Sequence, residues 1–266
     1  MSKAGKHAIV TGGSSGIGSA IVERLEEAGT KVAILDLNKP GAGSGAAFFE
    51  CDVTDEPTVI AAVAEAAAHL GGLDRAFLNA GVGASGALVD LSGEEWDRVH
   101  AVDLRGVFLT LREAAKVMLA AGGRGSMVVT ASVCGFLTDR RMSHYNSAKA
   151  GAISLAKVAA AELGCSGIRV NVVAPGVTET PMSAVTDTML VGYRDAVTHR
   201  TPLGAFGDPR HVADAAVTLS DLEWVTGQVL AADGGLSLFS PIDLEDFLPE
   251  AAGTAKWLAG SGVGDA

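Results

Sequence analysis

The stretch TGGSSGIG, residues 11–18, decides the fold because it joins a strand pattern to a helix pattern through small residues. The apolar run HAIVT (7–11) leads into it, and beyond it Ile17, Ile21 and Leu25 recur at helical spacing. Backbone N–H groups at the first turn of such a helix, helped by the helix dipole, bind an anion where no side chain blocks the approach. The stretch therefore predicts a phosphate-binding turn, made by Gly12, Ser14, Ser15, Gly16, Ile17 and Gly18.

A second glycine cluster, NAGVGASG at 79–86, matches the dinucleotide-binding pattern G-x-G-x-x-G more literally. The segment ALVDL separates it from the next helix, which we expect to start near Gly93 because Ser92 and Glu95 have the spacing of a capping box. A phosphate-binding loop must run straight into a helix. We therefore assign the phosphates to 12–18 and predict that 79–86 forms a wall beside the cofactor.

An acidic residue stands where a dinucleotide site needs one. Asp36 ends the strand pattern KVAILD (31–36), about 20 residues beyond the glycine turn, where a carboxylate accepts hydrogen bonds from the adenosine ribose hydroxyls. An acid here repels the 2′-phosphate of NADP, and neither Ser14, Ser15 nor Leu37 supplies a compensating cation. The sequence predicts NAD as the cofactor.

Short β-branched runs alternate with longer helical patterns from residue 7 to about residue 232. This alternation predicts an α/β fold, namely a Rossmann-type doubly wound seven-stranded parallel sheet with helices on both faces in a single domain. We place this domain at 1–239, including a long connection at 177–207 that is a candidate substrate loop, with a tail at 240–266. The strand candidates are 7–11, 31–36, 46–52, 73–79, 126–132, 168–174 and 228–233.

The bulk composition excludes several classes of protein. A formal charge of −11 opposes binding to nucleic acid or to an anionic membrane surface. No uninterrupted apolar stretch reaches the roughly 18 residues of a spanning helix, and the N-terminus has no signal-peptide core, so we expect a cytoplasmic protein. The three cysteines have no C-x-x-C spacing and the histidines no ligand spacing, so we expect no metal site.

Three residues have the chemistry of a dehydrogenase. Tyr145 and Lys149 are four residues apart in an Ala-rich helical pattern (143–164) and therefore share a face, and Ser132 ends the fifth strand pattern. Oxidation of an alcohol requires a base for the hydroxyl proton. A lysine ammonium stabilises a tyrosine phenolate and lowers its pKa from about 10, while a serine hydroxyl holds the substrate oxygen. His144 is adjacent to Tyr145 but points about 100° away on a helix, so we do not expect it to take part.

In this order the motifs resemble those of the short-chain dehydrogenase/reductase family. They are TGGSSGIG, Asp36 with Asp52, NAG at 79–81, Ser132, YNSAK at 145–149, PGVTET from Pro175 and TGQVLAADGG from Thr226, and the resemblance covers about residues 5–238. It implies that Tyr145 is the catalytic acid/base, that Lys149 modulates the pKa of Tyr145 and binds ribose, and that Ser132 positions the substrate. The further cofactor contacts that it implies are Leu37, Asp52, Val53, Asn79, Ala80, Gly81, Pro175, Gly176, Val177, Thr178 and Thr180.

One position departs from the family pattern. The family usually has Asn in a V-N-x-x-G segment, where this chain has VDLRG with Asp103. The resemblance implies that the main-chain carbonyl of that residue holds a water that relays protons to the lysine. We therefore include Asp103 among the catalytic residues and expect that its backbone does the work while its side chain is tolerated.

The resemblance also implies a substrate pocket, flanked by Ser132, Val133, Cys134, Tyr145 and Met182. These residues indicate a neutral, fairly apolar secondary alcohol or ketone. The tail contains apolar residues and extends past Asp233–Gly235 further than is usual in the family, so we expect it to pack on a neighbouring subunit of a homotetramer or dimer. Two other functions fit the same motifs: a non-catalytic NAD-sensing module, and an epimerase or dehydratase with no net redox change.

Overall fold

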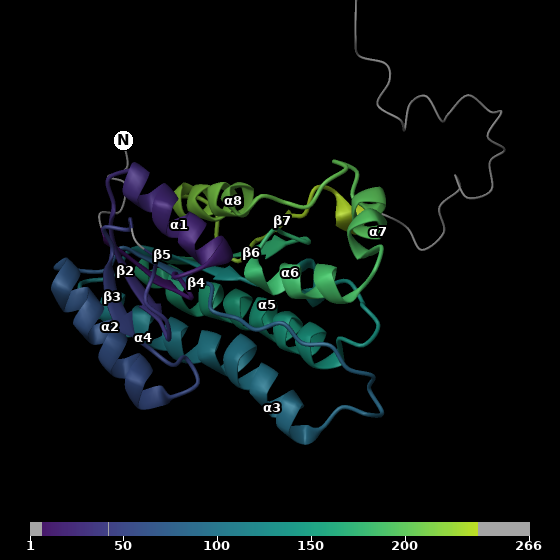
Figure 1. Ribbon diagram of the computed structural model, residues 1–266. Coiled ribbons are helices and arrows are strands. Elements are labelled where there is room, and N and C mark those ends of the chain that lie inside the picture. Colours follow the sequence, from purple (N-terminus) through teal and green to yellow (C-terminus); the bar gives the residue numbers. More distant parts are fainter. Residues whose placement is uncertain (1–6, 42, 239–266) are drawn as a thin grey trace, which may run out of the picture.

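The computed structural model describes residues 7–41 and 43–238, which form one α/β unit around a central sheet (Figure 1). The sheet has seven strands in the order β3-β2-β1-β4-β5-β6-β7, and every neighbouring pair is parallel. The predicted doubly wound seven-stranded sheet is confirmed. The strands are β1 (His7–Thr11), β2 (Lys31–Asp36), β3 (Ala47–Glu50), β4 (Arg75–Leu78), β5 (Gly125–Thr130), β6 (Ile168–Pro175) and β7 (Val229–Ala232).

Helices cover both faces of the sheet. Helices α1 (Gly16–Glu27) and α8 (Pro209–Asp221) lie together on one face, and α2 (Glu56–Leu70), α4 (Val107–Ala120) and α5 (Ser143–Leu163) lie on the other (Figure 1). Strand β1 shows why both layers form: Ala8 and Val10 pack in the cluster with α1 and α8, whereas Ile9 packs in the cluster with α2, α4 and α5. A strand with apolar residues at successive positions presents apolar side chains to both faces of the sheet, so both faces must be covered.

The helix predicted near residue 93 is α3 (Gly93–His100), followed by a π-helical turn η1 (Ala101–Gly106). Ser92 caps it by accepting a hydrogen bond from the Glu95 backbone N–H, as predicted. The other half of the expected capping box is wrong. The Glu95 carboxylate pairs with Arg98 instead, because a residue three positions further on in the helix lies next to it.

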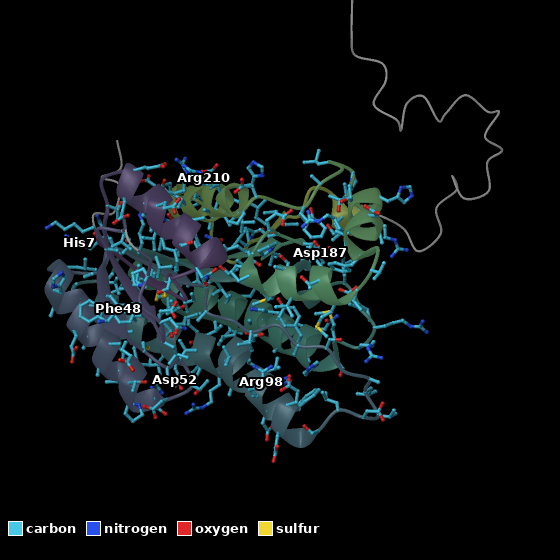
Figure 2. The ribbon with its side chains drawn as sticks, in the orientation of Figure 1. His7, Phe48, Asp52, Arg98, Asp187 and Arg210 are labelled. Atoms are coloured by element: carbon cyan, nitrogen blue, oxygen red, sulfur yellow. The ribbon has the colours of Figure 1, made fainter. Side chains whose placement is uncertain are left out.

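The segment 177–207 contains two helices, α6 (Pro181–Met189) and α7 (Tyr193–Arg200). The Thr180 hydroxyl caps α6 by accepting from Ser183 N, and Arg194 of α7 binds both Glu179 and Asp187. Figure 2 shows Asp187 on α6, at the opposite end of the molecule from Phe48 on β3. The long connection is therefore a helical substructure, and it lies on the β6 and β7 side of the sheet (Figure 1).

The tail predicted at 240–266 lies outside the described residues. None of the helices that the structure describes is long and apolar enough to cross a membrane.

Candidate active site

The predicted phosphate-binding turn enters helix α1 directly. Helix α1 begins at Gly16, and within the described chain the side chain of its N-cap residue, Ser15, makes no capping hydrogen bond. Gly12 and Gly16 have φ angles of +64° and +53°, which L side chains rarely adopt. A Cβ on Gly18 would lie 2.0 Å from the Gly12 carbonyl oxygen. The turn is therefore tightly closed, free of blocking side chains, and open at a helix N-terminus, which fits a dinucleotide diphosphate.

Asp36 faces this turn from the end of β2. Its Oδ2 accepts from the Ser14 backbone N–H at 3.1 Å, and its Oδ1 accepts from Asn38 N at 3.0 Å. The Ser14 hydroxyl donates to the Asn38 carbonyl oxygen at 2.5 Å, while the Leu37 side chain points outward and is 60% exposed. The glycine turn and the acidic residue thus form one hydrogen-bonded unit, with the carboxylate at the position predicted for ribose recognition.

The NAG segment is tied to the same turn. The Thr11 hydroxyl oxygen accepts from Asn79 N at 3.0 Å and from Ala80 N at 3.1 Å, and Asn79 Nδ2 donates to the Gly12 carbonyl oxygen at 3.3 Å. Sequence reasoning missed Thr11. Its signal was a hydroxyl at the last position of a buried strand, where it needs a partner.

Asp52 and Val53, expected beside the adenine, lie beyond the end of β3. Asp52 Oδ1 accepts from both the backbone N–H (2.8 Å) and the hydroxyl (2.7 Å) of Thr54. Val53 is buried, and a Cβ on Gly106 would come within 2.9 Å of its Cγ2. Asp52 is labelled in Figure 2, and both bonds from Thr54 are made to its Oδ1; Val53 contributes mainly to the core.

Ser132, Tyr145 and Lys149 meet at the carboxyl edge of the sheet. Ser132 lies two residues past β5 rather than ending it, and its hydroxyl oxygen accepts from Cys134 N at 3.1 Å. On α5, Lys149 Nζ lies 5.5 Å from the centre of the Tyr145 ring and donates to the Thr130 carbonyl oxygen at 3.4 Å. The predicted helical pairing of tyrosine and lysine is therefore present, beside the serine.

The net shift in the pKa of Tyr145 differs from the expected one. Burial raises the pKa of Tyr145 above its usual value, and this effect outweighs the lowering by the Lys149 ammonium and the Ser132 hydroxyl. Burial lowers the pKa of Lys149, but the negative groups around it, with Asp103 foremost, overcome this and leave its pKa raised. Lys149 does lower the pKa of Tyr145, as expected, but burial leaves the pKa raised overall. The spacing of the two residues along a helix does not reveal how far they are desolvated.

Asp103 lies in the π-helical turn η1 and is fully buried. Its Oδ1 accepts from the Val82 backbone N–H at 2.9 Å and is 3.8 Å from Lys149 Nζ. Burial raises the pKa of Asp103, and Lys149 and the Val82 N–H oppose the shift. The side chain is therefore directed into the site, in addition to the backbone role expected for this residue.

Residues 175–180 pass close to the glycine turn. Gly176 packs against Asp233, since a Cβ there would lie 2.8 Å from the Asp233 Cα. The Thr178 hydroxyl donates to the Gly176 carbonyl oxygen at 3.1 Å, and Val177 O accepts from Gly207 N. A Cβ on Gly16 would lie 3.2 Å from the Thr180 methyl group. Pro175 ends β6, so the segment crosses from that strand to the N-terminus of α1.

The residues expected to line the substrate pocket have apolar or neutral surfaces. Val133 is buried, and the Cys134 thiol donates to Asp139 at 3.1 Å; burial raises the pKa of Cys134 to about 12, so it stays a neutral thiol. Met182 of α6 faces the 79–86 loop, since a Cβ on Gly83 would lie 3.0 Å from its Cγ. A hollow of about 410 Å³ opens beside Cys134, which is the one predicted pocket residue in its lining; the charged residues Asp139 and Arg141 line it together with Leu88 and Phe136.

His144 is fully buried, and neither ring nitrogen has a hydrogen-bond partner among the residues that the structure describes. Burial lowers its pKa, so the ring is neutral. Across residues 7–41 and 43–238, no group of three or more His, Cys, Asp or Glu side chains could hold a metal ion.

Comparisons with known proteins agree with this geometry. The family model described as "Enoyl-(Acyl carrier protein) reductase" matches residues 12–237. The 2,5-dichloro-2,5-cyclohexadiene-1,4-diol dehydrogenase of Sphingobium indicum is 40% identical over 246 residues, covering 88% of this chain and 97% of that protein. The (3R)-3-hydroxyacyl-CoA dehydrogenase of Mus musculus is 38% identical over 249 residues, covering 86% and 95%. The solved aldohexose dehydrogenase of Thermoplasma acidophilum has a TM-score of 0.86 at 31% identity, covering 92% and 98%.

Fold, glycine turn and relatives together define an oxidoreductase that acts on CH–OH groups and uses a nicotinamide cofactor. The chain belongs to the short-chain dehydrogenase/reductase family.

Proposed function

We propose that this chain is an NAD-dependent dehydrogenase that interconverts a secondary alcohol and its ketone, with Tyr145 as the acid/base. The proposal is carried by the grouping of Ser132, Tyr145 and Lys149. A module that only senses NAD would have no need of these three side chains together. The 79–81 segment connects this group to the glycine turn, since Gly81 lies next to Lys149 and Asn79 donates to Gly12.

The three side chains divide the proton chemistry between them. In the oxidative direction the Tyr145 phenolate takes the hydroxyl proton, and the carbinol C–H bond breaks as its electron pair leaves with hydrogen as hydride. A bound nicotinamide would supply the hydride acceptor. Ser132 donates a hydrogen bond to the substrate oxygen and keeps it within reach of Tyr145, and the Lys149 ammonium favours the phenolate. In the reductive direction Tyr145 returns the proton.

Asp36 supports NAD over NADP. Its carboxylate stands beside the glycine turn, where a 2′-phosphate would bring two like charges together. The residues flanking this position, Ser14 and Leu37, are uncharged, and Lys39 lies on the exposed loop beyond Asn38. The carboxylate would instead accept hydrogen bonds from the ribose hydroxyls.

A neutral substrate with an apolar ring or chain suits the surroundings of the site. Val133, Cys134 and Met182 present uncharged surfaces, and the relatives at 40% and 38% identity are named for a cyclohexadiene diol and a 3-hydroxyacyl-CoA. We propose a secondary alcohol borne on a ring as the first class to test, with 3-hydroxyacyl compounds second.

Self-association belongs to the proposal. Beside the exposed apolar side chains of the 182–203 segment, two further groups occur among the described residues, one on α4 and α5 and one around the β7 edge. Two different patches that each pair with a second copy generate a tetramer with two-fold symmetry. The side chains are Phe108, Leu119 and Val158 in the first group and Leu222, Trp224 and Leu230 in the second. Light scattering on the full chain and on a truncation lacking 241–266 would separate these patches from a contribution of the tail.

The function is tested by NADH formation across a panel of cyclic and acyclic secondary alcohols. The wild type should form NADH with at least one of them, and Tyr145→Phe should lose at least about a hundredfold of kcat while still binding NAD. NAD binding without turnover across the panel would favour the sensing module. Product formation without NADH would favour an epimerase or dehydratase.

A further inference from the structure

A buried carboxylate lies directly against the lysine of the site. Asp103 Oδ1 is 3.8 Å from Lys149 Nζ, and Asp103 is 0% exposed. The approach depends on Gly81, because a Cβ there would lie 3.0 Å from Asp103 Oδ1 and 3.2 Å from Lys149 Nζ. Asp103 Oδ2 is also buried and has no hydrogen-bond partner within the part of the chain that the structure describes. Such a costly placement of a carboxylate indicates a role in the site.

The charged and titratable groups around Asp103 come from two helices. Helix α3 contributes Arg98, which Figure 2 shows on the α4 and α5 side of the sheet, and His100, whose ring is held by Trp96 and Ser147. On α4, by contrast, the charged side chains pair with one another and with Glu56. Helix α5 contributes His144, Tyr145 and Lys149.

Lys149 is the only ammonium among these groups, and it forms the ion pair with Asp103. The Asp103 carboxylate therefore partly neutralises the positive charge that Lys149 presents to Tyr145. We propose that Asp103 is a positioning residue that sets the pH at which Tyr145 changes from proton donor to proton acceptor, by neutralising part of the field of Lys149. This inference rests on the proposed function in one respect, namely that Tyr145 is the acid/base.

The sign follows from the electrostatics. Burial raises the pKa of Tyr145, Lys149 lowers it, and the Asp103 carboxylate raises it again. As long as Lys149 stays an ammonium, an uncharged residue at 103 should therefore lower the pKa of Tyr145 and extend alcohol oxidation to lower pH. As a carboxylate, Asp103 keeps more of Tyr145 as the phenol at neutral pH, which is the form that gives its proton to a ketone. Removing a unit charge within a few ångströms of a buried group shifts its pKa on the order of one unit.

The phenolate of Tyr145 can be followed without any substrate. The chain has two tyrosines, so Tyr193→Phe leaves Tyr145 as the single phenol that contributes to the ultraviolet phenolate absorbance. Adding Asp103→Asn to this background removes the charge and keeps an oxygen that can accept from the Val82 N–H. At the highest pH at which both proteins keep their circular dichroism, Asp103→Asn should raise the phenolate fraction about tenfold or shift the midpoint down by about one pH unit.

The matched control is Asp90→Asn, which removes an exposed carboxylate from the same background and should leave the phenolate titration unchanged. Asp103→Ser removes the same charge with a smaller side chain, and it must shift Tyr145 in the same direction if the asparagine variant does not fold. An unchanged or higher midpoint in a folded Asp103 variant overturns the proposal. Absence of turnover in the wild type would overturn the proposed function while leaving this titration interpretable.

Where turnover is found, the acid limb of kcat/KM for alcohol oxidation should move to lower pH by the same amount in Asp103→Asn. A uniform loss of kcat at every pH, with the limb unmoved, would show a structural role only.

Discussion

Replacing Gly18 by alanine should weaken NAD binding about tenfold to a hundredfold, because the space for the new methyl group is already filled. A Cβ at Gly18 would lie 2.0 Å from the Gly12 carbonyl oxygen and 2.6 Å from Asn79 Nδ2. Carbon–oxygen contacts of this kind are normally about 3.3 Å or longer, so the turn must open by about 1 Å. The hydrogen bond from Asn79 Nδ2 to Gly12, 3.3 Å long, cannot survive that movement unchanged.

The size of the effect follows from overpacking of a closed turn. Forcing a methyl group into a filled site costs about 1–3 kcal/mol, and for a chain of this size each kcal/mol lowers Tm by about 2–4 °C. We therefore expect a folded protein with Tm lower by about 2–12 °C. A displacement of the turn that costs the bound diphosphate about 1.4–2.8 kcal/mol raises the Kd of NAD about tenfold to a hundredfold.

Isothermal titration with NAD measures the Kd, and thermal melting followed by circular dichroism measures the stability. The control is the double variant Gly83→Ala with Gly86→Ala in the second glycine cluster. Its new methyl groups would meet the flexible side-chain ends of Met182 at 3.0 Å and Leu91 at 3.2 Å, so NAD affinity should stay within about twofold. A folded Gly18→Ala protein that binds NAD like the wild type would refute the assignment of the phosphates to 12–18, as would loss of NAD binding in the double variant.

Three further predictions follow from single contacts. Asp36→Ala should shift the ratio of kcat/KM for NAD over NADP toward NADP by about tenfold to a hundredfold, measured with one alcohol; an unchanged ratio contradicts the selectivity proposal. Met182→Ala should raise KM for the alcohol about threefold to tenfold and leave KM for NAD unaltered, because Met182 is expected at the substrate pocket and contacts Gly83, beyond the 79–81 segment expected at the cofactor. Asp221→Asn should lower the free energy of unfolding by about 1–2 kcal/mol in urea, since the buried Arg75 loses its carboxylate partner at 2.7 Å; full activity with unchanged stability would contradict this.

The architecture was predictable because it depends on local patterns. Apolar runs of strand length, helical periodicity and one glycine turn predict a parallel sheet and place Asp36 beside the turn, where the structure has it. The ends of the strands were predicted less well. Ser132 was placed at the end of a strand, but the last β5–β6 pair is Thr130 with Val173, and Ser132 instead caps a short turn through Cys134 N. Hydrogen bonds to loops end a strand, and sequence pattern does not reveal them.

The burial of the site residues is the main property that could not be predicted from the sequence. The spacing of Tyr145 and Lys149 predicts that they share a helix face, yet how far they are desolvated depends on α3 and η1 packing against α5. The same packing buries His144 and directs the Asp103 side chain toward Lys149. Sequence reasoning left the Asp103 side chain without a clear contribution because a helical pattern shows periodicity but not what lies across the interface.

The two glycine clusters differ in which neighbouring group comes close to the glycines. In the first, Gly12 and Gly18 let a strand turn back onto the N-terminus of a helix that begins at Gly16, so the open N–H groups face an anion. In the second, helix α3 does not begin until Gly93, and Gly83 instead leaves room for Met182 of α6. A literal G-x-G-x-x-G therefore indicates that another group packs closely against the backbone. Only a helix that begins directly after the glycines indicates that this group is a phosphate and not a neighbouring side chain.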